Sequence, residues 1–186
     1  MSTLHIKNMV CDRCKKVIKD ELTALGVLVH SVDLGVLDID PRSITLEAIE
    51  KVIRDQGFEV IESKEEILAE EIKLFLMSII NSFPIQRKNK LSTLISEGLG
   101  KDYSSLSKVF SRMEHITIEK YFLRLKLEKV KEMIQDGTHS FSQIASVLDY
   151  SSINHLSGQF KQETGLSMSE YKSMINRDRK PLDKIV

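Results

Sequence analysis

The chain has 186 residues, of which 41% are hydrophobic, 6% aromatic and 29% charged. No apolar run reaches the roughly 18 residues that a membrane-spanning helix needs, and the first residues lack the basic stretch and apolar core of a secretory signal. We therefore expect a cytoplasmic protein of one large or two small domains, with no membrane partner. That reducing compartment favours a metal or redox role over a structural disulfide for the two cysteines.

The charge is divided unevenly along the chain, although it sums to zero. Residues 1–69 hold 9 Lys and Arg against 13 Asp and Glu, whereas residues 70–186 hold 18 against 14. A mildly basic second part is typical of proteins that approach a polyanion. Ordinary variation of surface composition gives the same asymmetry, so charge alone leaves both interpretations open.

The first 63 residues carry the pattern of a small α+β domain. Residues 3–9 alternate apolar and polar side chains, as a half-buried strand does. Residues 12–25 repeat apolar side chains at intervals of three and four, as one face of a helix does. Two strand-like segments around Gly35 predict a hairpin, and a second helix and a last strand at residues 58–61 follow it. The order β-α-β-β-α-β predicts a ferredoxin-like fold.

Cys11 and Cys14 lie where the first strand gives way to the first helix. Two thiolates one helical turn apart can bind one soft metal ion or form a local disulfide, and the helix start with Arg13 favours their ionised form. Soft ligands at low coordination number favour Cu(I). Zinc is less favoured because it needs further ligands. His5 and Asp12 are the nearby candidates, but we interpret them as a strand residue and a first-turn charge.

The strand that ends in Met9, the Cys11-x-x-Cys14 pair and the Gly57-Phe58 step before the last strand resemble the heavy-metal-associated domain. That domain occurs in copper chaperones and in metal-pumping ATPases. The resemblance covers residues 1–63 and implies a metal ion at the two cysteines. This chain departs from the family at Asn8, where most members have Gly.

Residues 65–82 predict one long amphipathic helix, which Pro84 limits. The apolar stripe of this helix is expected to contain Ile67, Leu68, Leu74 and Phe75. We favour a helix that packs on the domain that follows it. A dimerisation helix or a connector that carries a signal is the alternative.

Beyond this helix, residues 94–110 and residues 144–161 resemble each other. Each segment has a short apolar helix, a turn, a small polar N-cap (Asp102 or Ser151) and a second helix with Leu and Phe four apart. This pattern predicts a helix-turn-helix motif that occurs twice. A long helix over residues 117–135, without Gly or Pro, is expected to hold the two motifs at a fixed distance. The expected core residues are Leu106, Phe110, Leu156 and Phe160.

The two motifs, together with the blocks 118–131 and 164–171, resemble the DNA-binding domain of the AraC/XylS family of bacterial regulators. The resemblance implies that the second helix of each motif enters a major groove, which returns to the same face of the duplex after about 34 Å. By motif position, DNA contacts fall to Ser104, Ser107, Lys108, Ser152, Asn154, His155, Ser157 and Lys161. Asn and Lys suit base readout, whereas Lys161 and the helix-start amides at Ser104 and Ser152 suit phosphates. An ordinary exposed role is the alternative for each residue.

Three positions depart from that family in ways that affect the second motif. Asp149 stands in the turn where a Gly is usual, and Asp tolerates a positive φ better than most residues. Gly158 stands in the reading helix where Arg is frequent, which removes a DNA contact and weakens the helix by about 1 kcal/mol. Met168 replaces a common Pro. We therefore expect weaker sequence readout by the second motif.

These observations predict an α+β protein whose ferredoxin-like domain (1–63) precedes an all-α double helix-turn-helix domain. A connecting helix (64–84) joins it to the DNA-binding domain (85–176), and a tail follows (177–186). We predict a DNA-binding regulator, not an enzyme, that responds to Cu(I) or another soft metal ion at Cys11 and Cys14. The alternatives are a thiol-redox regulator and a metal carrier whose helical half binds a protein. Double-stranded DNA is the expected partner, and RNA polymerase and a second copy of the chain are further candidates.

Overall fold

The structure is a computed structural model that describes residues 1–42, 44–82, 84–85, 90–174 and 185. The chain divides into two compact units, residues 1–74 with 104–115 and residues 75–103 with 116–186. None of the described helices is long and apolar enough to cross a membrane. Of the predicted tail, residues 177–186, only residue 185 is among the described residues.

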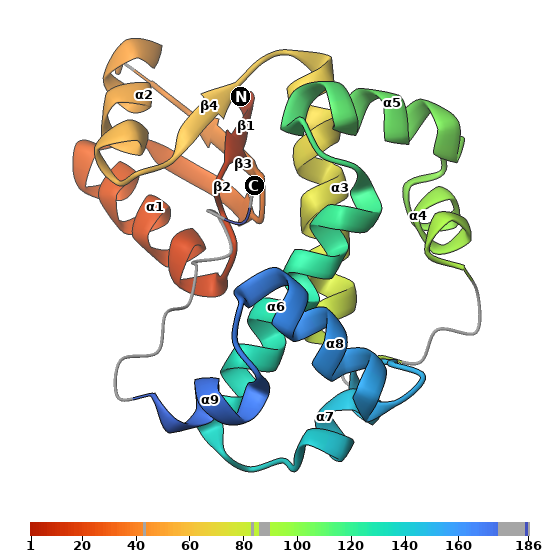
Figure 1. The fold of residues 1–186 in the computed structure, drawn as a ribbon. Helices are drawn as coiled ribbons and strands as arrows, with labels where there is room; N and C mark the ends of the chain where they lie inside the picture. The colour runs from red at the N-terminus through yellow and green to blue at the C-terminus, as the bar shows by residue number, and fades with distance from the viewer. Residues whose placement is uncertain (43, 83, 86–89, 175–184, 186) are drawn as a thin grey trace. The chain divides into compact units, whose positions relative to one another are not determined.

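The first unit is built on one antiparallel sheet whose strands lie in the order β2-β3-β1-β4. The strands are β1 (Ser2–Lys7), β2 (Leu28–Asp33), β3 (Val36–Asp40) and β4 (Glu59–Ile61). Helix α1 (Asp12–Leu25) joins β1 to β2, and helix α2 (Leu46–Asp55) joins β3 to β4. Figure 1 shows both helices on the same face of the sheet. The elements therefore follow one another in the predicted βαββαβ order.

The core of this unit lies between the sheet and those two helices. The period-2 alternation of the central strands turns Ile6, Leu37 and Ile39 to the covered face, where each side chain is 0% exposed. The apolar stripes of the helices meet them there, since the cluster continues through Met9, Ile18, Leu22, Val27, Ile49 and Ile53. The residues that the strand and helix periodicities predict to be buried thus form one core.

Helix α3 (Lys64–Asn81) follows β4 and supplies residues to both units. In the first unit, Leu74 packs so close to the β2–β3 turn that a Cβ on Gly35 would lie 2.7 Å from its Cδ1 atom. In the second unit, Phe75 lies against Gly98, where an added Cβ would meet its ring at 2.2 Å. Both glycines are therefore required by a close approach. The contact at Gly98 agrees with a helix that packs on the segment that follows it.

The predicted apolar stripe of α3 does not coincide with its most buried face. Ile67, Leu68, Leu74 and Phe75 are only partly buried. The fully covered face is instead formed by Ala69, Ile72, Leu76, Met77 and Ile80, and it includes the charged residues Glu70 and Lys73. Because α3 is apolar on several sides, its periodicity alone did not identify the face that packing selects.

The second unit is helical throughout its described part. It contains α4 (Leu91–Leu99), α6 (Ile118–Asp136), α7 (Phe141–Val147), α8 (Ile153–Thr164) and α9 (Met168–Ser173), while α5 (Tyr103–Glu114) has its residues from Ser104 onward in the first unit. Helix α6 begins at the N-cap Thr117, whose hydroxyl accepts the Lys120 N–H at 3.2 Å. Leu125 and Val130 of this helix are 0% exposed, and the charged residues Lys126 and Glu128 are also buried. The expected long helix is confirmed.

Candidate nucleic-acid interface and cysteine site

The second predicted motif is a helix-turn-helix formed by α7 and α8. Asp149 occupies the left-handed region in the turn, with φ 57°, as expected for a position where Gly is usual. The N-cap of α8 is Ser152 rather than the predicted Ser151, since its hydroxyl accepts the His155 N–H at 3.1 Å. The prediction was one residue too early because either serine could close the helix.

The outer face of α8 carries the predicted DNA-contacting residues. Ser152, Asn154, His155 and Lys161 are exposed, and Ser157 is half-buried. The His155 ring is oriented by two neighbours, because its Nδ1 atom lies 3.1 Å from the Ser151 hydroxyl and its edge meets the Tyr150 ring at 5.5 Å between centroids. The helix thus presents polar groups with both donor and acceptor atoms to the outside.

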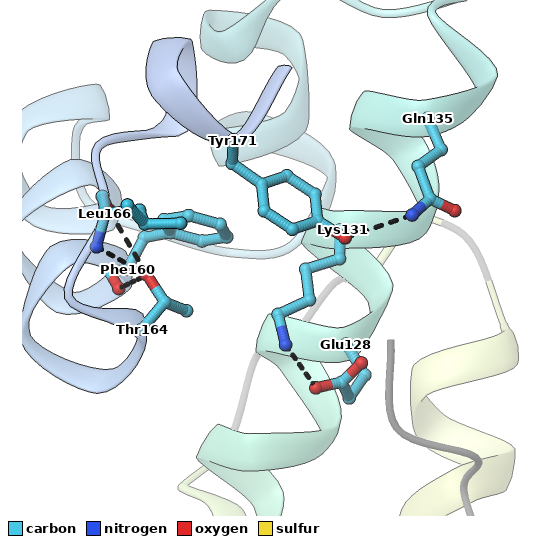
Figure 2. Close-up of polar contacts among 7 residues, drawn as sticks. All are labelled: Glu128, Lys131, Gln135, Phe160, Thr164, Leu166 and Tyr171. Atoms are coloured by element: carbon cyan, nitrogen blue, oxygen red, sulfur yellow. Dashed lines mark hydrogen bonds and ion pairs between the residues drawn. The ribbon is translucent and has the colours of Figure 1, made fainter. Parts of the chain in front are cut away.

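The inner face of α8 is locked against α6 and α9 within the second unit (Figure 2). Leu156 and Phe160 are 0% exposed, and the Phe160 ring meets the Tyr171 ring edge-on at 5.6 Å. The Tyr171 hydroxyl in turn accepts a hydrogen bond from Gln135 Nε2 at 3.0 Å. These contacts fix one face of α8, and the opposite face is exposed.

The end of α8 is closed by Thr164, whose hydroxyl donates to the carbonyl of Phe160 at 2.7 Å (Figure 2). The same oxygen accepts the Leu166 N–H at 3.2 Å and so fixes the turn toward α9. Ser167 and Glu170 then form a capping box at the start of α9. The block 164–171 therefore fixes the C-terminal end of α8 and the start of α9.

The first predicted motif comprises α4 and α5. Ser104 and Lys108 are exposed, Ser107 is half-buried, and the expected core residues Leu106 and Phe110 are 0% exposed. Tyr103, the first residue of α5, donates its hydroxyl to Glu119. Burial and this hydrogen bond raise the pKa of Tyr103 well above its ordinary value, so the phenol stays protonated.

Cys11 and Cys14 lie at the start of α1, with their sulfur atoms 3.4 Å apart. Cys11 is the N-cap of this helix and is exposed, whereas Cys14 is half-buried. Both are free thiols, since a disulfide would bring the sulfurs to about 2.05 Å. Asp12 pairs with Lys15 at 2.6 Å in the first helical turn, as interpreted from the sequence.

The two thiols have different acidities. Burial raises the pKa of Cys11, but hydrogen bonds from Cys14 and the neighbouring Arg13 charge outweigh it and leave that pKa below its ordinary value. Burial raises the pKa of Cys14 above its ordinary value, and the adjacent Cys11 adds to this. The expectation that the helix start ionises both thiols therefore agrees with the direction at Cys11 and disagrees with it at Cys14.

The donor set at this position fits a soft ion of low coordination number. Two sulfurs at 3.4 Å can close on one ion without a change of fold. Among the described residues, no group of three or more His, Cys, Asp and Glu could hold a metal ion. A tetrahedral zinc site of protein ligands alone therefore has no support in the described part of the chain.

Sequence reasoning did not identify a buried charged cluster in the first unit. Lys73 of α3 lies 3.1 Å from Glu70 and 2.9 Å from Glu114, the last residue of α5. The spacing of Glu70 and Lys73 is a local signal that could have indicated a helical ion pair. Nothing in the sequence indicated that the pair is buried or that Glu114 joins it.

Comparisons with known proteins agree with this geometry in the helical part. Residues 95–174 match the family model described as a helix-turn-helix domain. No curated protein matches the chain in a sequence comparison.

Three solved structures resemble the chain. The C-terminal domain of AraT, a response regulator from Geobacillus stearothermophilus, is 21% identical over 61% of this chain and 92% of its own, with a TM-score of 0.51. A DNA-binding transcriptional dual regulator from Escherichia coli K-12 is 20% identical over 54% and 88%, with a TM-score of 0.47. A transcriptional regulator with an AraC-type DNA-binding domain from Chromobacterium violaceum is 17% identical over 58% and 97%, with a TM-score of 0.49. The family match identifies residues 95–174 as a helix-turn-helix domain.

Proposed function

We propose that this protein is a transcriptional regulator that binds double-stranded DNA through α5 and α8 and responds to a soft metal ion at Cys11 and Cys14. The observation that carries the DNA-binding part is the repeated motif itself. Each of the two helices buries a Leu and a Phe four residues apart. The exposed polar residues are Ser104 and Lys108 on α5, and Asn154, His155 and Lys161 on α8. Helices of this kind enter the major groove in other helix-turn-helix proteins.

The polar faces of the two helices suggest how the contacts are shared. Asn154 can pair with an adenine edge and Lys108 with guanine. Lys161 near the end of α8 and the amides at the α8 start are suited to phosphate oxygens. Gly158 offers no side chain, so α8 has fewer base-reading groups than its length permits. We therefore assign more phosphate binding to the second motif than base readout.

DNA binding is tested with a fluorescent duplex of about 20 base pairs, long enough for two successive grooves, selected from a random pool. Lys108→Ala and Lys161→Ala are each expected to weaken binding and to reduce the slope of log affinity against log salt by about 1. Lys51→Ala, which removes an exposed lysine of α2, is the matched control and should leave affinity and slope unchanged. Binding that does not depend on salt would contradict the proposal.

The metal-responsive part is supported by the donor set of two adjacent thiols and by the βαββαβ order, which supports a ferredoxin-like, heavy-metal-associated domain. When bound, Cu(I) would supply a linkage between the two sulfurs. It can shift DNA binding only if its affinity differs between the DNA-competent and incompetent states. Anaerobic Cu(I) addition is expected to change DNA affinity in the wild type and not in the Cys11→Ser/Cys14→Ser variant. An equal response in both proteins excludes the cysteine site.

A second candidate function is a thiol-redox switch at the same pair. The free sulfurs at 3.4 Å and the lowered pKa of Cys11 favour it. Hydrogen peroxide would oxidise the two thiols to one disulfide and be reduced to two water molecules. An organic hydroperoxide would do the same and be reduced to an alcohol and one water, and in both cases the products take up the two thiol protons. Peroxide treatment under strict metal chelation, followed by the same DNA titration, separates this candidate from the metal response. A metal carrier that docks a protein is favoured instead if no salt-dependent DNA binding is found.

A further inference from the structure

Three charged side chains are buried together inside the first unit. Lys73 of α3 contacts Glu70 on its own helix at 3.1 Å and Glu114 at the end of α5 at 2.9 Å. All three side chains are 7–8% exposed. Burial lowers the pKa of Lys73, but the charges and hydrogen bonds of the two carboxylates outweigh it and hold the pKa above its ordinary value. The cluster therefore contains a positive charge between two acidic groups.

The cluster also reaches the segment that precedes the cysteines. The backbone N–H of Asn8 donates to Glu70 Oε1 at 3.1 Å, while Glu70 Oε2 faces Lys73. Asn8 has a φ of 74°, in the left-handed region that non-glycine residues seldom adopt. It stands three residues before Cys11, and the intervening Met9 is 0% exposed. A conformation of this kind persists when its surroundings hold it, and Glu70 is the group that does so here.

The cluster therefore joins three segments of one unit that are far apart in the sequence. Glu70 contacts the end of β1, Lys73 joins the two carboxylates, and Glu114 belongs to the helix proposed to read DNA in the first motif. Glu70 contacts both Asn8 and Lys73, and Lys73 contacts both Glu70 and Glu114, so a displacement of one group changes the environment of the next. A carboxylate that loses its partner here would remain in a medium of low dielectric, which makes partial separation costly.

Simple attachment of α5 to α3 does not require this arrangement. Arg112 of α5 and Glu65 of α3 already join the same two helices by an ion pair, with side chains 60% and 48% exposed. Buried ion pairs are also poor stabilisers, because apolar residues of similar volume often serve as well. The buried cluster differs from the exposed pair in its burial and in its contact, through Asn8, with residues 8–11, here called the cysteine loop.

We propose that Asn8, Glu70, Lys73 and Glu114 form a coupling path that transmits a change in the cysteine loop to the C-terminal end of α5. The regulatory meaning of this path rests on the proposed function, whereas the coupling itself does not. A loop movement that withdraws the Asn8 N–H leaves Glu70 Oε1 without its donor. Glu70 then shifts relative to Lys73, and the Lys73–Glu114 contact changes with it. The loop and the helix end thereby share two arrangements.

The first test perturbs the loop and measures amide hydrogen exchange at residues 109–115 of the full chain. Asn8→Val places a β-branched side chain at a positive φ and should strain the loop, whereas Asn8→Gly keeps the conformation and the N–H donor. Asn8→Val is expected to raise exchange at the α5 end by about fivefold, the effect of losing one net hydrogen bond. Asn8→Gly should leave it unchanged. Equal exchange in the wild type and Asn8→Val would overturn the proposal.

The second test perturbs the helix end and reads the Asn8 amide directly by NMR-detected exchange. Glu114→Gln removes the charge and keeps the shape, and is expected to raise exchange at Asn8 by about fivefold. Glu65→Gln, which breaks the exposed pair between the same helices, is the matched control and should have no effect. If both substitutions act equally, or neither acts, the proposed path is wrong.

A third variant separates coupling from loss of folding. Glu70→Gln/Lys73→Met/Glu114→Gln replaces all three charges together and leaves no unpaired buried ion. In this background, Asn8→Val should no longer alter exchange at residues 109–115. A persisting effect would show that the change travels by another route. Because none of these measurements involves DNA or metal, their failure is distinguishable from failure of the proposed function.

Discussion

Helices α1 and α8 begin at residues with nearly the same backbone conformation and different chemistry. Cys11 has φ −158° and ψ 168°, and Ser152 has φ −163° and ψ 162°. The Ser152 hydroxyl accepts the His155 N–H and closes its helix, whereas Cys11 makes no such cap bond and its sulfur faces Cys14. The same backbone conformation therefore caps a helix when the side chain ends in oxygen, and leaves the side-chain atom free of the helix start when it ends in sulfur.

The largest difference is expected between the ion pairs of the two units, in the free energy of unfolding that is lost when each is broken. Lys73→Met leaves two buried carboxylates unpaired in the unit of α1, so the free energy of unfolding should fall by about 3–5 kcal/mol. Lys120→Met breaks the partly exposed pair with Glu163 of α8 and should cost no more than about 1 kcal/mol. Urea denaturation of both variants measures the two values. Similar losses would show that burial gives the Lys73 ion pairs no larger effect on stability than the partly exposed pair has.

The next effect concerns the cap of α8. Ser152→Ala removes the oxygen that accepts the His155 N–H, and should lower the free energy of unfolding by about 1 kcal/mol. Ser151→Ala is the comparison, because it removes an exposed contact with the His155 ring but no N-cap hydrogen bond, and should cost less. A larger loss at Ser151 than at Ser152 in thermal or urea unfolding would mean that the originally predicted cap is the working one.

At the start of α1, introducing a serine is expected to raise the free energy of unfolding. Cys11→Ser places a hydroxyl where the backbone already has an N-cap conformation, and should stabilise the protein by about 0.5–1 kcal/mol. Cys14→Ser lies inside the helix and gains no cap. Urea unfolding under reducing, metal-free conditions compares them. Destabilisation by Cys11→Ser would show that its sulfur contributes more to the fold than its contacts indicate.

A smaller effect is expected within α8. Gly158 has open space where a Cβ would stand, so Gly158→Ala should stabilise the helix by about 0.5–1 kcal/mol without altering its shape. Gly165→Ala is the matched control and should destabilise, because its φ of 77° suits glycine. If Gly158→Ala also destabilises, the exposed face of α8 is packed in solution.

The last test distinguishes the two thiols by pH. Alkylation requires the thiolate, and the pKa of Cys11 lies below the ordinary value while that of Cys14 lies above it. As pH rises, iodoacetamide should therefore modify Cys11 first and Cys14 only at higher pH. Peptide mass spectrometry after short pulses follows each site. Modification in the reverse order would contradict the difference in burial and hydrogen bonding described for the pair.

The sequence was sufficient for features that depend on neighbouring residues. The change from period 2 to period 3.6 identified β1 and α1, and the Leu–Phe spacing identified the core of α8, because both patterns record one-sided burial. The covered face of α3 was missed because that helix is apolar on several sides. Glu114 was missed because its partner Lys73 is 41 positions away, a distance that no local pattern reveals. The raised pKa of Cys14 was also missed, because it depends on burial in the folded chain.

The tight packing of Leu74 on Gly35 has a consequence for protein engineering. A designer who grafts the β-sheet module onto another protein would naturally cut the chain after the last strand. Such a cut would discard the first turns of α3 and uncover the hairpin tip that they press against. A transplanted module should therefore extend at least through Leu74 and keep a glycine at the hairpin.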